Sequence, residues 1–186
     1  MPPQERSITR LIRQRPTEQD YATLDREVQH AHPRSAAILL SSEVELYLEF
    51  AILTRFPRND TKTVKLLVDR DGPLSGFYAK IHLAYAMGII DDDTCHDLNI
   101  IRRVRNVFAH APRPIIFATQ EVSREISRIK CTADRTYEAR RPLVNALAGL
   151  TDEPVRERFI ESCRELGLAL LRSANAASAA AVTASA

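Results

Sequence analysis

The chain has 186 residues, of which 45% are hydrophobic and 27% are charged, as in an ordinary globular protein. Its 26 Lys and Arg nearly balance its 24 Asp and Glu, and the resulting net charge of +2 lacks the basic surplus of a dedicated nucleic-acid-binding protein. No apolar run approaches the ~20 residues that span a bilayer, and the N-terminus lacks the apolar segment of a secretory signal. We therefore expect a cytoplasmic protein that makes no membrane contact.

The two ends of the chain differ in composition from the part between them. Residues 1–16 hold four arginines, three prolines and no aromatic residue, which predicts a flexible basic arm; a tail that contacts phosphate groups is the alternative. Residues 173–186 are mostly Ala and Ser and are predicted to be disordered or frayed. The region 17–172 is predicted to form one helical domain.

The first two predicted helices cover residues 17–30 and 34–56. Thr17 can cap the first, and Pro33 separates it from the second. The second helix is apolar on nearly all sides, which predicts a position at the centre of the core. Its polar stripe consists of Ser42, Glu45 and Glu49. Either this stripe faces solvent, or a glutamate points inward and pairs with an arginine of a neighbouring helix, because a buried carboxylate needs a partner.

Turn signals separate the remaining predicted helices. Residues 69–73 are typical of a turn, and Gly88 is placed to cap the end of a helix. The acidic run 91–93 is predicted to open the next helix, which Pro112 ends near His110. The predicted helices are 61–68, 74–87, 93–110, 119–131, 136–148 and 152–172, with a connection at 111–118. Since no alternating strand pattern is long enough for a sheet, we predict an all-α bundle of six to eight helices, with 36–54, 74–87 and 93–110 at its centre.

The three cysteines are far apart in the sequence, and no pair has the spacing of a zinc or disulfide motif. We predict that Cys95, Cys131 and Cys163 are small, mostly buried thiols. A metal site can be imagined where Cys95 and His96 follow the acidic run 91–93, but the spacing of metal ligands is missing. We expect no metal and no cofactor.

The predicted helix 93–110 has one polar and one apolar side. Arg102, Arg103, Asn106 and His110 form a polar ridge with Arg105 at its margin, and Ile100, Ile101, Val104, Val107 and Phe108 are predicted to face the core. His110 lies at the helix end, where it can act as a C-terminal cap or as a general acid. Asn106 can shape the helix end through a local hydrogen bond.

The predicted helix 74–87 carries Tyr78, Lys80, His82 and Tyr85. We expect the two tyrosines, seven residues apart, to lie in the core rather than to form a platform for stacked bases. Lys80 is predicted to be a surface residue or a partner for Glu45 or Glu49, rather than a catalytic group. The same structural interpretation is preferred for His82.

Two segments of the chain resemble the mannitol operon repressor family. They are residues 72–90, with the sequence GPLSGFYAKIHLAYAMGII, and residues 97–110, with the sequence DLNIIRRVRNVFAH; Arg156 to Phe159 is a weaker match. The resemblance implies a compact helical transcriptional regulator without an evident helix-turn-helix. We expect such a regulator to act through a protein partner or a homodimer, with Lys80, Arg102 and Arg103 as candidate binding residues and only weak contact with nucleic acid.

The second segment also resembles the Arg-x4-His motif of the HEPN superfamily, which many ribonucleases share. The resemblance implies an alternative function as a metal-independent, toxin-like ribonuclease, with Arg105 and His110 as catalytic residues and Asn106 in support. There a histidine moves a proton and an arginine stabilises phosphate charge. A third alternative is a partner-binding member of that superfamily without catalysis. From the residues alone we prefer a structural role for this motif, so an enzyme is not the leading expectation.

Overall fold

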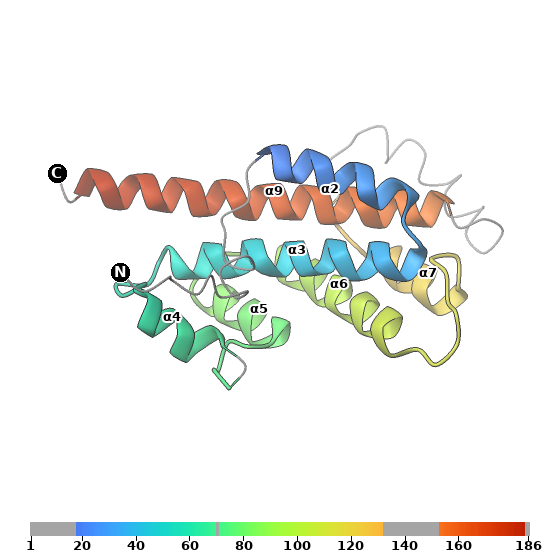
Figure 1. Ribbon diagram of the computed structural model, residues 1–186, viewed down its shortest axis with the longest axis horizontal. Helices are drawn as coiled ribbons and strands as arrows, with labels where there is room; N and C mark the ends of the chain where they lie inside the picture. Colours follow the sequence, from blue (N-terminus) through green and yellow to red (C-terminus); the bar gives the residue numbers. More distant parts are fainter. Residues whose placement is uncertain (1–17, 70, 132–152, 185–186) are drawn as a thin grey trace, which may run out of the picture.

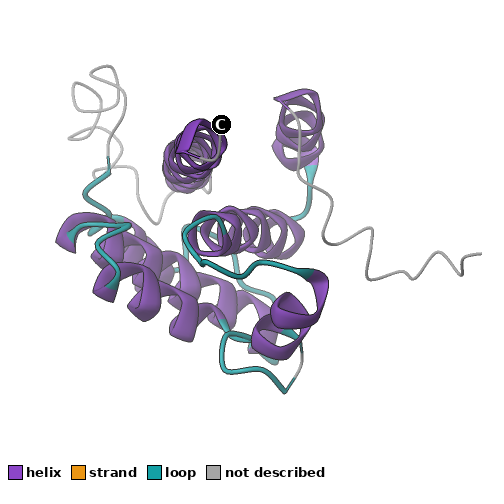
Figure 2. Cartoon of the chain, turned by 90° about the vertical axis from the view of Figure 1, so that its left-hand side faces the viewer, coloured by secondary structure: helices purple, strands orange, loops and turns teal. Residues whose placement is uncertain are grey.

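The computed structural model describes residues 18–69, 71–131 and 153–184, and every regular element among them is a helix (Figure 2). This confirms the predicted all-α class. In chain order the helices are α2 (Glu18–His30), α3 (Pro33–Leu53), α4 (Thr61–Val68), α5 (Phe77–Ala86), α6 (Asp92–His110), α7 (Gln120–Ile126) and α9 (Glu153–Ala184). The predicted arm 1–16 and the predicted helix 136–148 lie outside the described residues.

Helix α3 lies in the middle of the bundle, as its apolar composition predicted. Helices α2 and α9 cover one side of α3, and α5 and α6 cover the other (Figure 1). Its buried side chains lie on one broad side of the helix, with Tyr47 and Leu48 among the largest of them, and Leu39 and Ser42 on the remaining side are exposed. The helices predicted to form the centre of the bundle did not include α9, which packs on α3 more extensively than α5 or α6 does. Gly167 of α9 permits this close approach: a Cβ atom there would lie 3.0 Å from the Tyr47 ring.

Several helix ends follow the predicted signals. Asp91 precedes α6 and accepts a hydrogen bond from the Thr94 amide at 2.8 Å, which satisfies one of the free donors of the first turn. Hydrogen bonds from Thr94 hold the pKa of Asp91 below its ordinary value. Gly88 follows α5 with φ of 65°, the left-handed conformation of a C-terminal cap. Pro33 begins α3 instead of preceding it, which suits proline because the first turn needs no amide donor.

Three of the helices are shorter at one end than the sequence predicted. Helix α3 ends at Leu53 instead of residue 56, and α7 ends at Ile126 instead of residue 131. Helix α5 begins at Phe77 instead of residue 74, because the Leu74 amide donates to the Leu67 carbonyl at 2.8 Å and holds the chain in a turn against α4.

The last helix is longer than composition predicted. We predicted a helix over 152–172 followed by a disordered or frayed tail, but α9 continues to Ala184 and its last turns extend past α2 (Figure 1). Alanine has the highest intrinsic helix propensity, so an Ala-rich segment that continues an existing helix adds turns at little cost. The structure thus describes residues 173–184 as part of α9, where composition predicted a disordered or frayed tail.

Arg156 of α9 is a buried cation that holds the end of α2. Its guanidinium donates to the carbonyls of Val28 at 2.7 Å, Ala31 at 2.6 Å and Gln29 at 3.3 Å. The last carbonyls of a helix lack partners within the helix and carry partial negative charge. A buried guanidinium with its several donors can therefore satisfy them together.

Arg158, one half-turn further along α9, does the same for α7. It donates from Nε to the Ile126 carbonyl at 3.0 Å and from Nη2 to the Ile129 carbonyl at 2.6 Å. The chain that leaves α7 is also held from the opposite side, because the buried Asp97 carboxylate accepts from the backbone amides of Lys130 at 2.9 Å and Cys131 at 2.6 Å. The match at residues 156–159 therefore marks two buried structural arginines.

Candidate functional site

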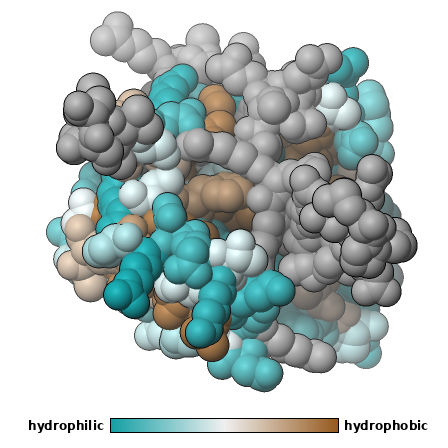
Figure 3. Space-filling model, turned by 60° about the vertical axis from the view of Figure 1, so that its left-hand side comes forward, coloured by the Kyte–Doolittle hydropathy of each residue, from teal (hydrophilic) through white to brown (hydrophobic). Residues whose placement is uncertain are grey.

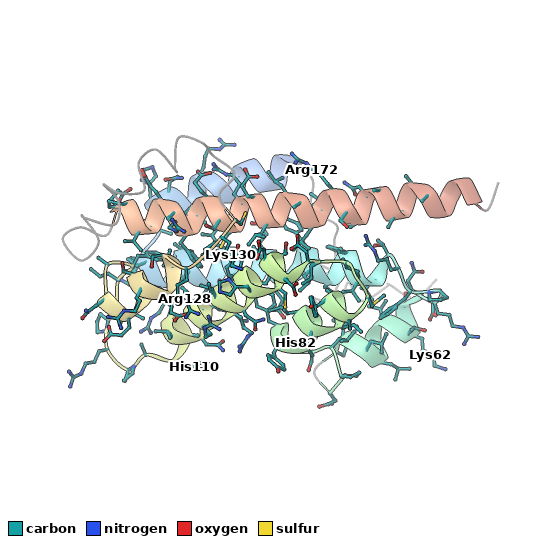
Figure 4. All side chains as sticks on the ribbon, turned by 180° about the vertical axis from the view of Figure 1, so that it is seen from behind. Lys62, His82, His110, Arg128, Lys130 and Arg172 are labelled. Carbon is teal, nitrogen blue, oxygen red and sulfur yellow. The ribbon has the colours of Figure 1, made fainter. Side chains whose placement is uncertain are left out.

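The outer side of α5 carries exposed aromatic rings. Tyr78 is 58% exposed and Tyr85 is 44% exposed, and His82 between them is exposed as well. The expectation that both tyrosines lie in the core was wrong. The core side of this short helix consists of Phe77, Lys80, Ile81 and Ala84, and positions 78, 82 and 85 lie on the opposite side because they are four and three residues apart. Figure 4 shows His82 pointing away from the bundle.

The rings of this stripe contact one another and the neighbouring helix. The Tyr78 and His82 ring centroids are 4.2 Å apart, and the Arg102 guanidinium of α6 lies 5.2 Å from the Tyr78 centroid, within range of a cation–π interaction. The Tyr85 hydroxyl donates to Asp92 at 2.6 Å, and this hydrogen bond raises the pKa of Tyr85. We call Tyr78, His82, Tyr85, Asp92 and Arg102 the α5–α6 stripe.

The three arginines of α6 have different partners. Arg103 donates from Nε and Nη2 to the same Glu125 oxygen, at 3.1 and 2.8 Å. Burial alone would raise the pKa of Glu125, but the bonds from Arg103 and Arg128 outweigh it and lower the pKa. Arg105 lies 3.9 Å from Glu45. Arg102 bonds weakly to Asn99 at 3.4 Å and forms no ion pair with any described residue.

Beneath the stripe is a buried cluster of charges that joins α3 to α5 and α6. Lys80 Nζ lies 2.8 Å from both Glu45 Oε1 and Glu49 Oε2, and Arg105 approaches Glu45 from α6. Of the two alternatives left open for the polar stripe, the structure therefore shows the inward one for Glu45 and Glu49, and Lys80 is their partner instead of a surface residue. Burial alone would lower the pKa of Lys80, but the two carboxylates outweigh it and raise the pKa. Lys80 is therefore a buried residue that joins α5 to α3. Its ammonium group is not exposed, so it is not accessible for the predicted role in partner binding.

The end of α6 differs from the prediction in two ways. Val107 was expected in the core but is 47% exposed, because the buried side of α6 rotates through Ile100, Ile101, Val104 and Phe108 and leaves position 107 outside. His110 is exposed at the helix end (Figure 4), and its side chain forms no hydrogen bond with the described residues. Instead, Arg34 of α3 donates to the Ala111 carbonyl at 2.9 Å. The catalytic roles of Arg105 and His110, and the supporting role of the half-buried Asn106, stay predictions.

The acidic residues before α6 are engaged in different contacts. Asp91 caps the helix, Asp92 accepts from Tyr85, and Asp93 pairs with Lys130 at 2.5 Å. Within the described ranges no three His, Cys, Asp or Glu side chains form a group that could hold a metal ion. Burial raises the pKa of the Cys131 thiol to about 11 and also raises the pKa of Cys95 and of the fully buried Cys163. All three are thus poor nucleophiles near neutral pH.

The described part of the face shown in Figure 3 is mixed in polarity. On the face shown in Figure 3, hydrophilic side chains cover most of the described surface and apolar side chains lie between them. None of the described helices combines the length and apolar character that a bilayer crossing requires. The α5–α6 stripe therefore stands out by its aromatic rings and by two charges that lack an ion-pair partner among the described residues, more than by hydrophobicity.

The chain is similar to known proteins both in sequence and in fold. The model of the mannitol repressor family matches residues 40–161, which include α5, α6 and most of α3. The chain belongs to the mannitol repressor family. No curated protein matches it. Among solved structures, the X-ray structure of the MtlR–HPr complex from Escherichia coli matches with a TM-score of 0.61 and 20% identity, over 80% of this chain and 99% of that chain. At this identity the structural match supports the shared fold, and the mannitol repressor family model supports the family.

Proposed function

We propose that this mannitol repressor family member is a cytoplasmic transcription regulator that acts through protein association, both with itself and with a partner of the HPr kind. The observation that carries the proposal is the match, over nearly the whole of the matched chain, to an MtlR crystallised as a complex with HPr. Membership of the mannitol repressor family supports the regulatory part of the proposal.

The distribution of charge supports protein association over direct binding to nucleic acid. Affinity for a nucleic acid grows with the number of phosphates that free cations can neutralise. In this molecule Arg103, Arg105 and Lys130 are paired with carboxylates of the chain itself, and the net charge is only +2. We expect purified protein to bind duplex DNA weakly, without sequence preference, and to lose that binding as salt rises.

The test is calorimetric titration of the full chain with purified HPr, alongside titration with duplex DNA at two salt concentrations. We expect saturable binding of HPr that persists at physiological salt. Absence of heat and of co-elution with HPr, together with tight and sequence-specific DNA binding, would show that the protein is a direct DNA-binding repressor instead. Sedimentation of the protein alone measures self-association independently of HPr.

A further inference from the structure

The α5–α6 stripe carries two opposite charges that lack an ion-pair partner among the described residues. Within the described part of the chain, Asp92 accepts a hydrogen bond only from the neutral Tyr85 hydroxyl, and Arg102 contacts a ring and an amide oxygen. The adjacent charges Asp93, Arg103 and Arg105 all have carboxylate or ammonium partners within the chain. The stripe therefore differs from its charged neighbours on α6 in having charges available to another molecule.

The order of these groups along the surface follows from the antiparallel packing of the two helices. Tyr85 near the end of α5 reaches Asp92 at the start of α6, and Tyr78 near the start of α5 lies under Arg102. The ten residues from Asp92 to Arg102 span about 15 Å along a helix. His82 lies midway, so the surface reads from one end to the other as carboxylate, rings and guanidinium.

A surface with this order is complementary to a copy of itself turned by a two-fold rotation. In an isologous interface each patch meets the same patch on the other subunit, so the carboxylate end of one stripe faces the guanidinium end of the other. The exposed Tyr78 and Tyr85 rings would then pack between two pairs of opposite charges. Tyrosine and arginine are also among the residues most enriched where binding energy is concentrated.

We propose that two copies of this chain associate through the α5–α6 stripe, with Arg102 of each protomer against Asp92 of the other and His82 near the two-fold axis. This inference rests on the self-association in the proposed function and adds the surface and the pairing. A single strand of RNA could also stack on exposed rings beside an arginine. The acidic residue beside Tyr85 opposes a phosphate backbone at that end, so a second copy fits the whole stripe better.

The test uses charge reversal at both ends of the stripe. Arg102→Glu and Asp92→Lys each place like charges opposite one another in their own homodimers, so each variant should dissociate at protein concentrations at least about tenfold higher than the wild type. Mixing the two variants should restore association, because the carboxylate introduced at position 102 of one then faces the ammonium introduced at position 92 of the other, while the second pair is native. The double variant in one chain should also associate.

Controls separate the pairing from effects on folding. Tyr78→Ala should weaken association and Tyr78→Phe should retain it, since the ring alone stacks on Arg102. Arg172→Glu, an exposed reversal on α9, should leave association unchanged, and circular dichroism should show the same helix content for every variant. Sedimentation equilibrium is the measurement.

Each other outcome overturns the inference in a recognisable way. A monomeric wild type would refute self-association altogether, whereas HPr binding, measured separately, could still stand. A dimer that tolerates Arg102→Glu and Tyr78→Ala would show that the protein self-associates through another surface. Variants that dissociate but do not complement one another would refute the two-fold pairing, and RNA binding lost in Tyr78→Ala without any change in association would assign the stripe to RNA.

Discussion

Helices α6 and α9 both present arginines from the segments that resemble the mannitol operon repressors, but the two sets have different surroundings. Arg156 and Arg158 of α9 are buried and donate to backbone carbonyls at the ends of other helices. Arg102 of α6 is half-buried, and its guanidinium lies 5.2 Å from the centroid of the exposed Tyr78 ring. An arginine in a family motif can therefore secure the fold or remain available to a partner. Its burial and its acceptors distinguish the two roles.

The largest effect is expected in α9. Arg158→Ala should lower the free energy of unfolding by about 4 kcal/mol, because it removes hydrogen bonds from a charged donor and leaves buried carbonyls without partners. Arg158→Lys should recover only part of the loss, since an ammonium cannot reproduce the planar fork. Urea unfolding measures both, with the exposed Arg172→Ala as a control. A loss below about 1 kcal/mol would show that water replaces the guanidinium.

The charge cluster beneath the stripe should come next. Lys80→Ala leaves the Glu45 and Glu49 carboxylates without the ammonium group that lies between them. We expect the free energy of unfolding to fall by about 3 kcal/mol. Because the folded pKa of Lys80 is raised above its ordinary 10.5, its contribution is fully present below pH 10.5 and disappears as pH rises through the folded value. Wild-type stability should therefore fall in this alkaline range, and Lys80→Met should lack that component.

An effect of intermediate size is expected at the start of α6. Asp91→Ala should cost about 1 kcal/mol, the usual contribution of an N-cap. The folded pKa of Asp91 is lowered from 3.8, so its contribution is present above pH 3.8 and is lost as pH falls through the folded value. Thermal unfolding at pH 7 and at pH 2 should show a difference between wild type and variant only at the higher pH. An equal difference at both would assign the effect to helix propensity instead.

The smallest effect on stability is expected at the outer surface of α6. Arg102→Ala and His110→Ala should each change the free energy of unfolding by less than about 0.5 kcal/mol, as for most surface substitutions. The expectation that His110 caps the helix gives way to a different contact, because Arg34 takes the carbonyl there. The same variants test the ribonuclease alternative: metal-independent RNA cleavage by the wild type that is absent in His110→Ala would establish it.

The sequence was sufficient for the features that depend on local pattern. The apolar circumference of residues 36–53 predicted the central helix, and Asp91, Gly88 and Pro112 predicted where helices begin and end, since capping acts within one turn. The pairing of Lys80 with Glu45 and Glu49 was one of the alternatives that the sequence left open, because a buried carboxylate requires a cation but the pattern does not say which residue supplies it. Helix class and approximate boundaries follow from the same local rules.

Features that depend on how helices rotate against one another were not predictable. Tyr78 and Tyr85 have the spacing of a core stripe, and only the packing of Phe77 and Ile81 against the bundle shows that the rings face outward. The prediction that Val107 faces the core was wrong for the same reason. The buried role of Arg156 and Arg158 was not predictable either, because other charged residues adjoin them in the sequence and their carbonyl partners lie about thirty or more residues away.

The central claim is that the α5–α6 stripe meets a second copy of itself, and trapping by a disulfide tests it most directly. His82 should lie near the two-fold axis, so His82→Cys should form an intermolecular disulfide under mild oxidation, because thiols of two copies near the axis come within bonding reach. The native cysteines should contribute little, since burial raises the pKa of all three thiols. We predict a covalent dimer for His82→Cys and none for Arg172→Cys. A His82→Cys protein that stays monomeric while Arg172→Cys cross-links would contradict the account.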